Sequence, residues 1–168
     1  MNITLIGMAG AGKSIVGKEL AKRLDYRFVD VDKVIEKRNR MRLQQIIDGV
    51  GDDKFIKEEE RAVLSLGKIK NCIISPGGSV VYSKKAMAFL KNNSKIVFLD
   101  TSLKAIEKNI TNVNKRGIVG LKNRTLKELF EERLPLYKRY ADMVITIDKE
   151  FNLDLILKKI TKTFSLVS

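Results

Sequence analysis

The stretch that most constrains the fold of this chain is "GMAGAGKS" at residues 7–14, which directly follows the apolar run "ITLI" at residues 3–6. It matches the pattern G-x-x-x-x-G-K-[ST]. Glycines allow turns with positive φ, which aim successive backbone N–H groups inward and form a cradle for phosphate oxygens. A helix that starts near Lys13 points the positive end of its dipole at the same anion. The sequence therefore predicts a strand, a phosphate-binding loop and a helix in succession.

Two side chains of this loop have chemical tasks of their own. Lys13 is placed to reach the β- and γ-phosphates of a nucleoside triphosphate, and the Ser14 hydroxyl is a ligand for Mg²⁺. We therefore predict that Lys13 is catalytic and that Ser14 is a metal ligand. The residues predicted to contact ATP are Gly10, Ala11, Gly12, Lys13, Ser14 and Ile15.

Along the rest of the chain, short apolar runs alternate with longer segments of helical period. The predicted strands are residues 3–6, 27–31, 72–75, 96–100 and 143–147. The predicted helices are residues 13–24, 54–66, 84–90, 103–110, 125–140 and 153–164. Short strands that are apolar on both faces and separated by helices indicate a parallel sheet covered on both sides. We expect an α/β fold, a three-layer α/β/α sandwich with a five-stranded parallel sheet.

The length of 168 residues suits one domain, and the 44% of apolar residues suffice for a core. No apolar stretch approaches the roughly 20 residues needed to cross a bilayer. The N-terminus shows neither the basic region nor the cleavage site of a signal peptide. The single cysteine, Cys72, lies in the apolar run "CIIS" and is expected to be a buried, inert thiol. We expect a cytoplasmic protein without membrane contact.

The charge pattern restricts both the chemistry and the partners. The chain has no histidine, which excludes imidazole acids and bases and histidine-ligated metals. The net charge of +13 favours anionic partners, either nucleic acid or phosphorylated metabolites. The basic residues are spread along the chain, and no cluster of aromatic and basic residues resembles an RNA-recognition motif. We therefore expect mostly solvated lysines and no nucleic-acid partner.

Two aspartates, Asp30 and Asp32, stand at the end of the second predicted strand. Their spacing predicts that both carboxylates lie on one face at the carboxyl end of a strand, where parallel α/β sheets bind ligands. One carboxylate near a metal ion and one that accepts a proton from a hydroxyl group suffice for phosphoryl transfer. The alternative is that one of them caps the following helix.

Further segments share their order and spacing with one enzyme family. They are "FVDVDKVIE" (28–36), "IIDGVGDDKFIKEEE" (46–60), "IISPGGSVV" (73–81), "KRGIV" (115–119) and "ERLPLYKRYAD" (132–142). Together with the phosphate-binding loop they resemble the shikimate kinase family of P-loop enzymes over nearly the whole chain. After the loop, the last segment is the most specific of them.

The resemblance implies an enzyme that phosphorylates the 3-hydroxyl of shikimate with ATP and Mg²⁺, and it implies a monomer. Asp30 then helps to hold Mg²⁺ through water, and Asp32 binds the acceptor hydroxyls and is the catalytic base. Arg116 reaches the phosphates as a catalytic residue of a lid, because an arginine can neutralise charge on the transferring phosphoryl group. The single domain, residues 1–168, divides into a core (1–32, 70–110 and 140–168), an acceptor-binding helical segment (33–69) and the lid (111–124).

On the acceptor side, the resemblance implies that Gly77 and Gly78 offer backbone N–H groups and that Arg133 binds the carboxylate of shikimate. An arginine suits that task because it pairs with a carboxylate through two parallel hydrogen bonds. Lys57 is predicted to bind the acceptor as a substitute for a second arginine of the family, whose position is Ile56 here. An ammonium group lacks the planar fork of a guanidinium.

Other departures from the family also fall on the acceptor side. Ser79 stands in place of a third glycine, and Pro76, which has no backbone N–H, precedes the glycine pair. Loss of one charged contact to a carboxylate costs about 30- to 1000-fold in affinity. Two alternatives to shikimate phosphorylation therefore stay open: a kinase for another hydroxy acid or polyol, and a nucleotide-binding relative without turnover.

Overall fold

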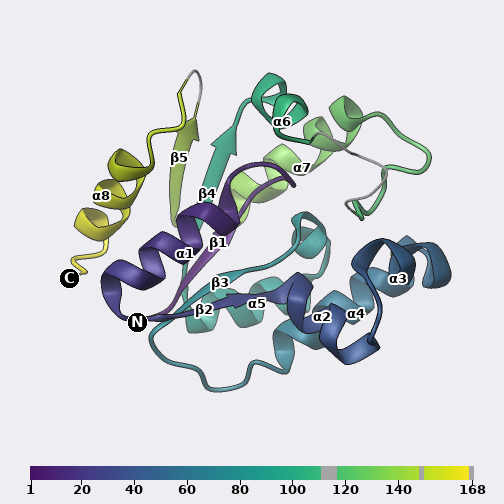
Figure 1. Cartoon of the computed structure of the whole chain (residues 1–168), viewed down its shortest axis with the longest axis horizontal. Helices are drawn as coiled ribbons and strands as arrows, with labels where there is room; N and C mark the ends of the chain where they lie inside the picture. The colour runs from purple at the N-terminus through teal and green to yellow at the C-terminus, as the bar shows by residue number, and fades with distance from the viewer. Residues whose placement is uncertain (111–116, 148–149, 167–168) are drawn as a thin grey trace.

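The structure is a computed structural model that describes residues 1–110, 117–147 and 150–166. Its five parallel strands form one sheet in the order β2-β3-β1-β4-β5, with helices on both faces (Figure 1). The strands are β1 (Ile3–Ile6), β2 (Arg27–Asp30), β3 (Cys72–Ser75), β4 (Lys95–Thr101) and β5 (Met143–Ile147). The helices are α1 (Lys13–Leu24), α2 (Val31–Asn39), α3 (Leu43–Val50), α4 (Asp52–Leu64), the 3₁₀-helix η1 (Gly78–Tyr82), α5 (Lys84–Asn93), α6 (Leu103–Asn109), α7 (Leu126–Tyr140) and α8 (Leu153–Thr163). The predicted three-layer α/β/α fold is confirmed.

The alternation of side chains along the strands separates two apolar cores. Ile3 and Leu5 of β1 face α1 and α8, and they pack with buried residues of both helices. Ile6 faces the opposite layer, where α4, α5 and α7 contribute buried side chains. Because successive residues of a strand point to opposite faces, the three apolar residues of β1 serve both cores.

All strands run in the same direction, so their carboxyl ends meet at one edge of the sheet. Ile6 pairs with Phe98 of β4, and Asp30 pairs with Ser75 of β3. The loop after β1, the start of α2 and the turn after β3 therefore lie beside one another. Ligands bind at this edge in open α/β sheets.

The predicted strand 27–31 is one residue too long, and this changes the place of an aspartate. β2 ends at Asp30, whose side chain accepts a hydrogen bond from the backbone N–H of Lys33 at 3.3 Å. Asp30 thus caps α2, and Asp32 lies in the first turn of that helix. The prediction that both carboxylates share one face of a strand is wrong, and the capping alternative holds for Asp30.

Segment 33–69 contains more helix than the pattern indicated. Its predicted helix 54–66 is α4, which begins at Asp52, and the sequence did not predict α2 and α3. These two helices have nine and eight residues, which is shorter than the window of about 11–18 residues over which a helical period is read. From the described part of the predicted lid, the backbone N–H of Gly117 donates to Gln44 Oε1 of α3 at 2.8 Å.

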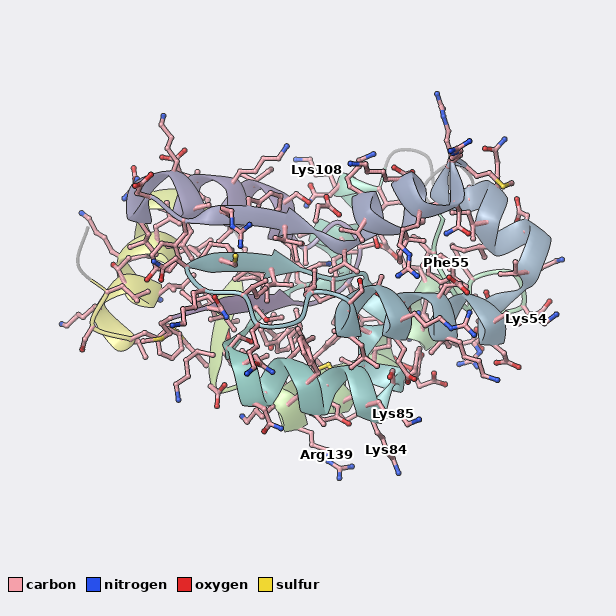
Figure 2. The ribbon with its side chains drawn as sticks, turned by 90° about the horizontal axis from the view of Figure 1, so that it is seen from below. Lys54, Phe55, Lys84, Lys85, Lys108 and Arg139 are labelled. Carbon is pink, nitrogen blue, oxygen red and sulfur yellow. The ribbon has the colours of Figure 1, made fainter. Side chains whose placement is uncertain are left out.

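Basic side chains extend from several separate elements rather than from one site. Figure 2 shows Lys84 and Lys85 at the start of α5, Arg139 near the end of α7, Lys108 on α6 and Lys54 on α4, and all five are exposed. Within the described residues, no helix combines the length and apolar character needed to span a membrane.

Candidate active site

A cavity of about 460 Å³ opens at the carboxyl edge of the sheet. The phosphate-binding loop, the turn after β3, residues 117–119 and α7 contribute to its walls. Most of the predicted site residues line it: Gly10, Ala11, Gly12, Lys13, Ser14, Ile15, Asp30, Asp32, Gly77, Gly78 and Arg133. Arg116, the predicted lid arginine, lies outside the residues that the structure describes.

The phosphate-binding loop closes around its own lysine. Gly10 and Gly12 have φ angles of 81° and 93°, a region that favours glycine. Lys13 Nζ donates to the backbone carbonyls of Gly7 at 2.8 Å and Met8 at 2.9 Å. The ammonium group is therefore held at the loop, where a bound anion would meet it.

Residues far along the chain support the loop from outside. Thr101 Oγ1, at the end of β4, donates to the backbone carbonyl of Ala11 at 3.1 Å. The ring of Phe151 packs on Gly12 so closely that a Cβ there would lie 2.6 Å from a ring carbon. The shape of the loop thus depends on β4 and on the segment before α8.

The two aspartates lie near each other in the cavity wall. Burial raises the pKa of Asp32 to about 6, the charge of Asp30 raises it as well, and the Lys13 ammonium opposes the shift. Asp32 is therefore mostly ionised at pH 7, and it is a stronger base than an exposed aspartate. Asp30 and the Ser14 hydroxyl supply oxygen atoms of the kind that bind Mg²⁺.

Gly77 lies between two buried carboxyl groups. A Cβ there would lie 2.5 Å from Glu59 Oε1 and 2.9 Å from Asp32 Oδ1. Among the described residues, these two oxygens have no hydrogen-bond partner. Burial and the charge of Asp32 raise the pKa of Glu59 to about 7, and its Oε2 accepts a hydrogen bond from Ser79 Oγ at 2.5 Å.

Arg133 is 1% exposed, although it is the largest of the fully buried side chains. Its Nη2 donates to the backbone carbonyl of Val119 at 2.7 Å, and its Nε donates to the Tyr82 hydroxyl at 3.2 Å. A Cβ on Gly78 would lie 3.0 Å from Nη1, so the glycine leaves room for the guanidinium. The arginine thus lines the cavity beside the turn after β3.

One turn further along α7, Tyr137 fixes the same turn. Its hydroxyl donates to the backbone carbonyl of Gly78 at 2.6 Å, and its ring stacks on Phe98 with a centroid distance of 5.0 Å. The cavity thereby combines a phosphate cradle, a basic carboxylate and a fixed guanidinium. Such a site can hold a nucleotide and an anionic, hydroxylated acceptor.

Comparison with known proteins identifies the family. The sequence model described as shikimate kinase matches residues 9–164. The chain belongs to the shikimate kinase family. It is 35% identical to the shikimate kinase of Caldanaerobacter subterraneus subsp. tengcongensis over 148 residues, which cover 87% of this chain and 86% of that one. It is 33% identical to the shikimate kinase of Sulfurihydrogenibium sp. over 161 residues, which cover 96% of each.

Solved structures of shikimate kinases have the same fold. The enzyme from Acinetobacter baumannii in complex with shikimate is 28% identical and superposes with a TM-score of 0.88, covering 98% of this chain and 93% of that one. The enzyme from Aquifex aeolicus is 29% identical with a TM-score of 0.79, covering 98% and 96%.

At the position where the sequence resemblance implies a second arginine, this chain has Ile56, and the described residues provide no nearby replacement. Lys57 is exposed and is not among the lining residues, so the predicted substitution finds no support. Lys54 is exposed as well, whereas the neighbouring Phe55 is buried and lines the cavity (Figure 2). Among the described residues, the lining cations are Lys13 and Arg133.

The sequence did not reveal three residues of this shikimate kinase site. Tyr82 and Tyr137 contact Arg133 and Gly78 across 51 and 59 positions of the chain, and no local pattern signals such pairs. Phe151 could have been found from the sequence, because it is a large apolar residue in a polar segment directly before a predicted helix.

Proposed function

We propose that this chain transfers the γ-phosphoryl group of ATP to the 3-hydroxyl of shikimate and so forms shikimate 3-phosphate and ADP. The observation that carries the proposal is one cavity in which the phosphate-binding loop faces Asp32, Gly77 and Arg133. The chain also belongs to the family that performs this reaction, and it resembles an enzyme solved in complex with shikimate.

At the nucleotide end, the loop N–H groups and Lys13 bind the phosphates of ATP. Ser14 and Asp30 would hold Mg²⁺, Asp30 through water, since both line the cavity with oxygen atoms. Their ion would supply positive charge to the phosphate oxygens. We assign to Arg116 the task of reaching the phosphates when the lid covers them.

At the acceptor end, Arg133 pairs with the shikimate carboxylate, and the N–H groups of Gly77 and Gly78 bind acceptor oxygens. The Asp32 carboxylate receives the proton of the reacting hydroxyl while the oxygen attacks the γ-phosphorus. The raised pKa of Asp32 suits this task, because a base works best when its pKa is near the operating pH.

A second candidate acceptor class follows from Ile56. Among the described residues one guanidinium lines the cavity, so the match to a carboxylate is less complete than with two. The same nucleotide-binding residues would then serve another hydroxy acid or a polyol.

The test is an assay that couples ADP release to a panel of acceptors, with the product identified by mass spectrometry and ³¹P NMR. We expect turnover with shikimate and a kcat/KM at least tenfold below that value for quinate and simple polyols. A preference for another acceptor would overturn the assignment of shikimate, and ADP release that is independent of any acceptor would overturn both candidates.

A further inference from the structure

Arg133 has an unusual environment for a ligand-binding arginine. It is 1% exposed, and its guanidinium carbon lies 5.1 Å from the centroid of the Tyr82 ring. A guanidinium over the face of an aromatic ring is attracted by the ring quadrupole, and this attraction increases when water is excluded. The Tyr82 ring therefore supports the plane of the guanidinium on one side.

The Tyr82 hydroxyl fixes the rotation of the same group. Its proton is donated to Glu132 Oε1, and its lone pair accepts the hydrogen bond from Arg133 Nε at 3.2 Å. The hydrogen bond from Tyr82 and the Arg124 guanidinium lower the pKa of Glu132, so this acceptor is ionised at neutral pH. A hydroxyl has one proton, and its donation to Glu132 leaves the oxygen free to accept from Nε.

The network also includes the described part of the lid. Arg124 forms an ion pair with Glu132, and the Val119 carbonyl accepts from Arg133 Nη2 at 2.7 Å. Within the segment 117–124, Val119 thus binds Arg133 directly, and Arg124 binds the Glu132 carboxylate that accepts from Tyr82. Tyr82 belongs to η1, directly after the turn that lines the cavity, so the network joins that turn, α7 and the lid.

We propose that Tyr82 is a positioning residue that holds the Arg133 guanidinium in register with the acceptor carboxylate. This inference rests on the proposed function, in which Arg133 binds that carboxylate. It has particular weight here because Ile56 leaves the acceptor end with one lining arginine among the described residues. A fixed guanidinium loses little freedom on binding, which compensates in part for the missing partner.

Two variants separate the hydroxyl from the ring. Tyr82→Phe removes the acceptor of the Nε hydrogen bond and keeps the ring, and we expect KM for shikimate to rise about tenfold. Tyr82→Leu removes both contacts, and we expect a rise of about thirtyfold or more. In both variants kcat and KM for ATP should stay within about twofold, a separation that general damage to the fold would not give. Tyr26→Phe is the matched control, since Tyr26 packs against the core on the α1 side.

Two further measurements ask whether Tyr82 acts through Arg133 and the carboxylate. In an Arg133→Lys background, we expect Tyr82→Phe to raise KM for shikimate by less than a further twofold. The guanidinium that Tyr82 would position is already absent there. We also expect no Tyr82→Phe defect with the cyclohexene triol that lacks the carboxylate. Wild-type kinetics for Tyr82→Phe, or an equal defect with the triol, would overturn the proposal. Absence of shikimate turnover in the wild-type chain would instead overturn the proposed function.

Discussion

The two ends of the cavity are built in different ways. The nucleotide end consists largely of the backbone of one continuous stretch, residues 7–15, whose carbonyls hold Lys13. The acceptor end consists of side chains from α2, α4 and α7, with η1 behind them. Apart from Lys13 and Ser14, the nucleotide end binds through backbone groups, which most side-chain substitutions leave in place, whereas a composite site can be altered one residue at a time. The departures from the family pattern at Ile56 and Ser79 fall on the composite end.

The largest expected effect comes from a substitution at the nucleotide end of the cavity. Lys13→Ala should abolish measurable turnover, a fall of at least about 1000-fold in kcat, because no other described lysine lines the phosphate cradle. Steady-state kinetics measure the fall, and circular dichroism checks that the fold persists. A variant with wild-type kcat for any acceptor would show that the loop is not the phosphate site.

The next effect separates chemistry from nucleotide binding. Asp32→Asn removes the base without changing the size of the side chain, so kcat should fall about 100- to 1000-fold. The Kd for ATP, measured by isothermal titration calorimetry, should change less than about threefold, because Asp32 belongs to the acceptor end. An unchanged kcat would remove Asp32 from the role of base.

A smaller effect concerns stability. The pKa of Glu59 is raised to about 7 in the folded chain by burial and by Asp32, so the folded state binds more protons than the unfolded state between about pH 4.5 and pH 7. Stability from this group is present at low pH and is lost as the pH rises through 7. Glu59→Gln keeps an acceptor for Ser79 and removes the titration.

Urea unfolding at pH 5 and pH 8 measures this effect. The free energy of unfolding of the variant relative to wild type should increase between the two values by up to about 3 kcal/mol. A pH-independent difference would show that Glu59 does not titrate in this range.

The smallest expected effect tests a prediction that the structure did not support. Lys57→Ala should leave KM for shikimate within about twofold, since an exposed lysine away from the cavity contributes only screened, long-range attraction. Lys54→Ala is the matched neighbour. A tenfold increase in KM for Lys57→Ala alone would restore it to the acceptor site.

The same contrast explains what sequence alone could predict. The loop, its strand and its helix are contiguous, so spacing and glycine chemistry located β1 and α1 with their observed bounds. Asp32 is predicted as a site residue but on the wrong element, because an aspartate in the first turn of a helix and one at the end of a strand look alike in sequence.

The acceptor end could be predicted only through its likeness to the family. Arg133 was found by its motif, yet its contacts with Tyr82 and Val119 depend on tertiary packing. From the sequence, Ser79 is a departure that weakens acceptor binding, because it adds a side chain in place of a family glycine. In the structure its hydroxyl donates to the buried Glu59 carboxylate at 2.5 Å, so the added side chain has a partner.

The position of Gly77 also limits how this pocket can evolve. Every other residue would bring a Cβ to within 3 Å of two carboxyl oxygens, so Asp32 and Glu59 would have to shift to admit a side chain here. The adjacent Gly78 is restricted as well, because a Cβ there would lie 3.0 Å from Arg133 Nη1. This chain has diverged from the family pattern at Ile56, Pro76 and Ser79. Adaptation to a new acceptor, in nature or in the laboratory, would therefore proceed around a fixed glycine, through residues that border it.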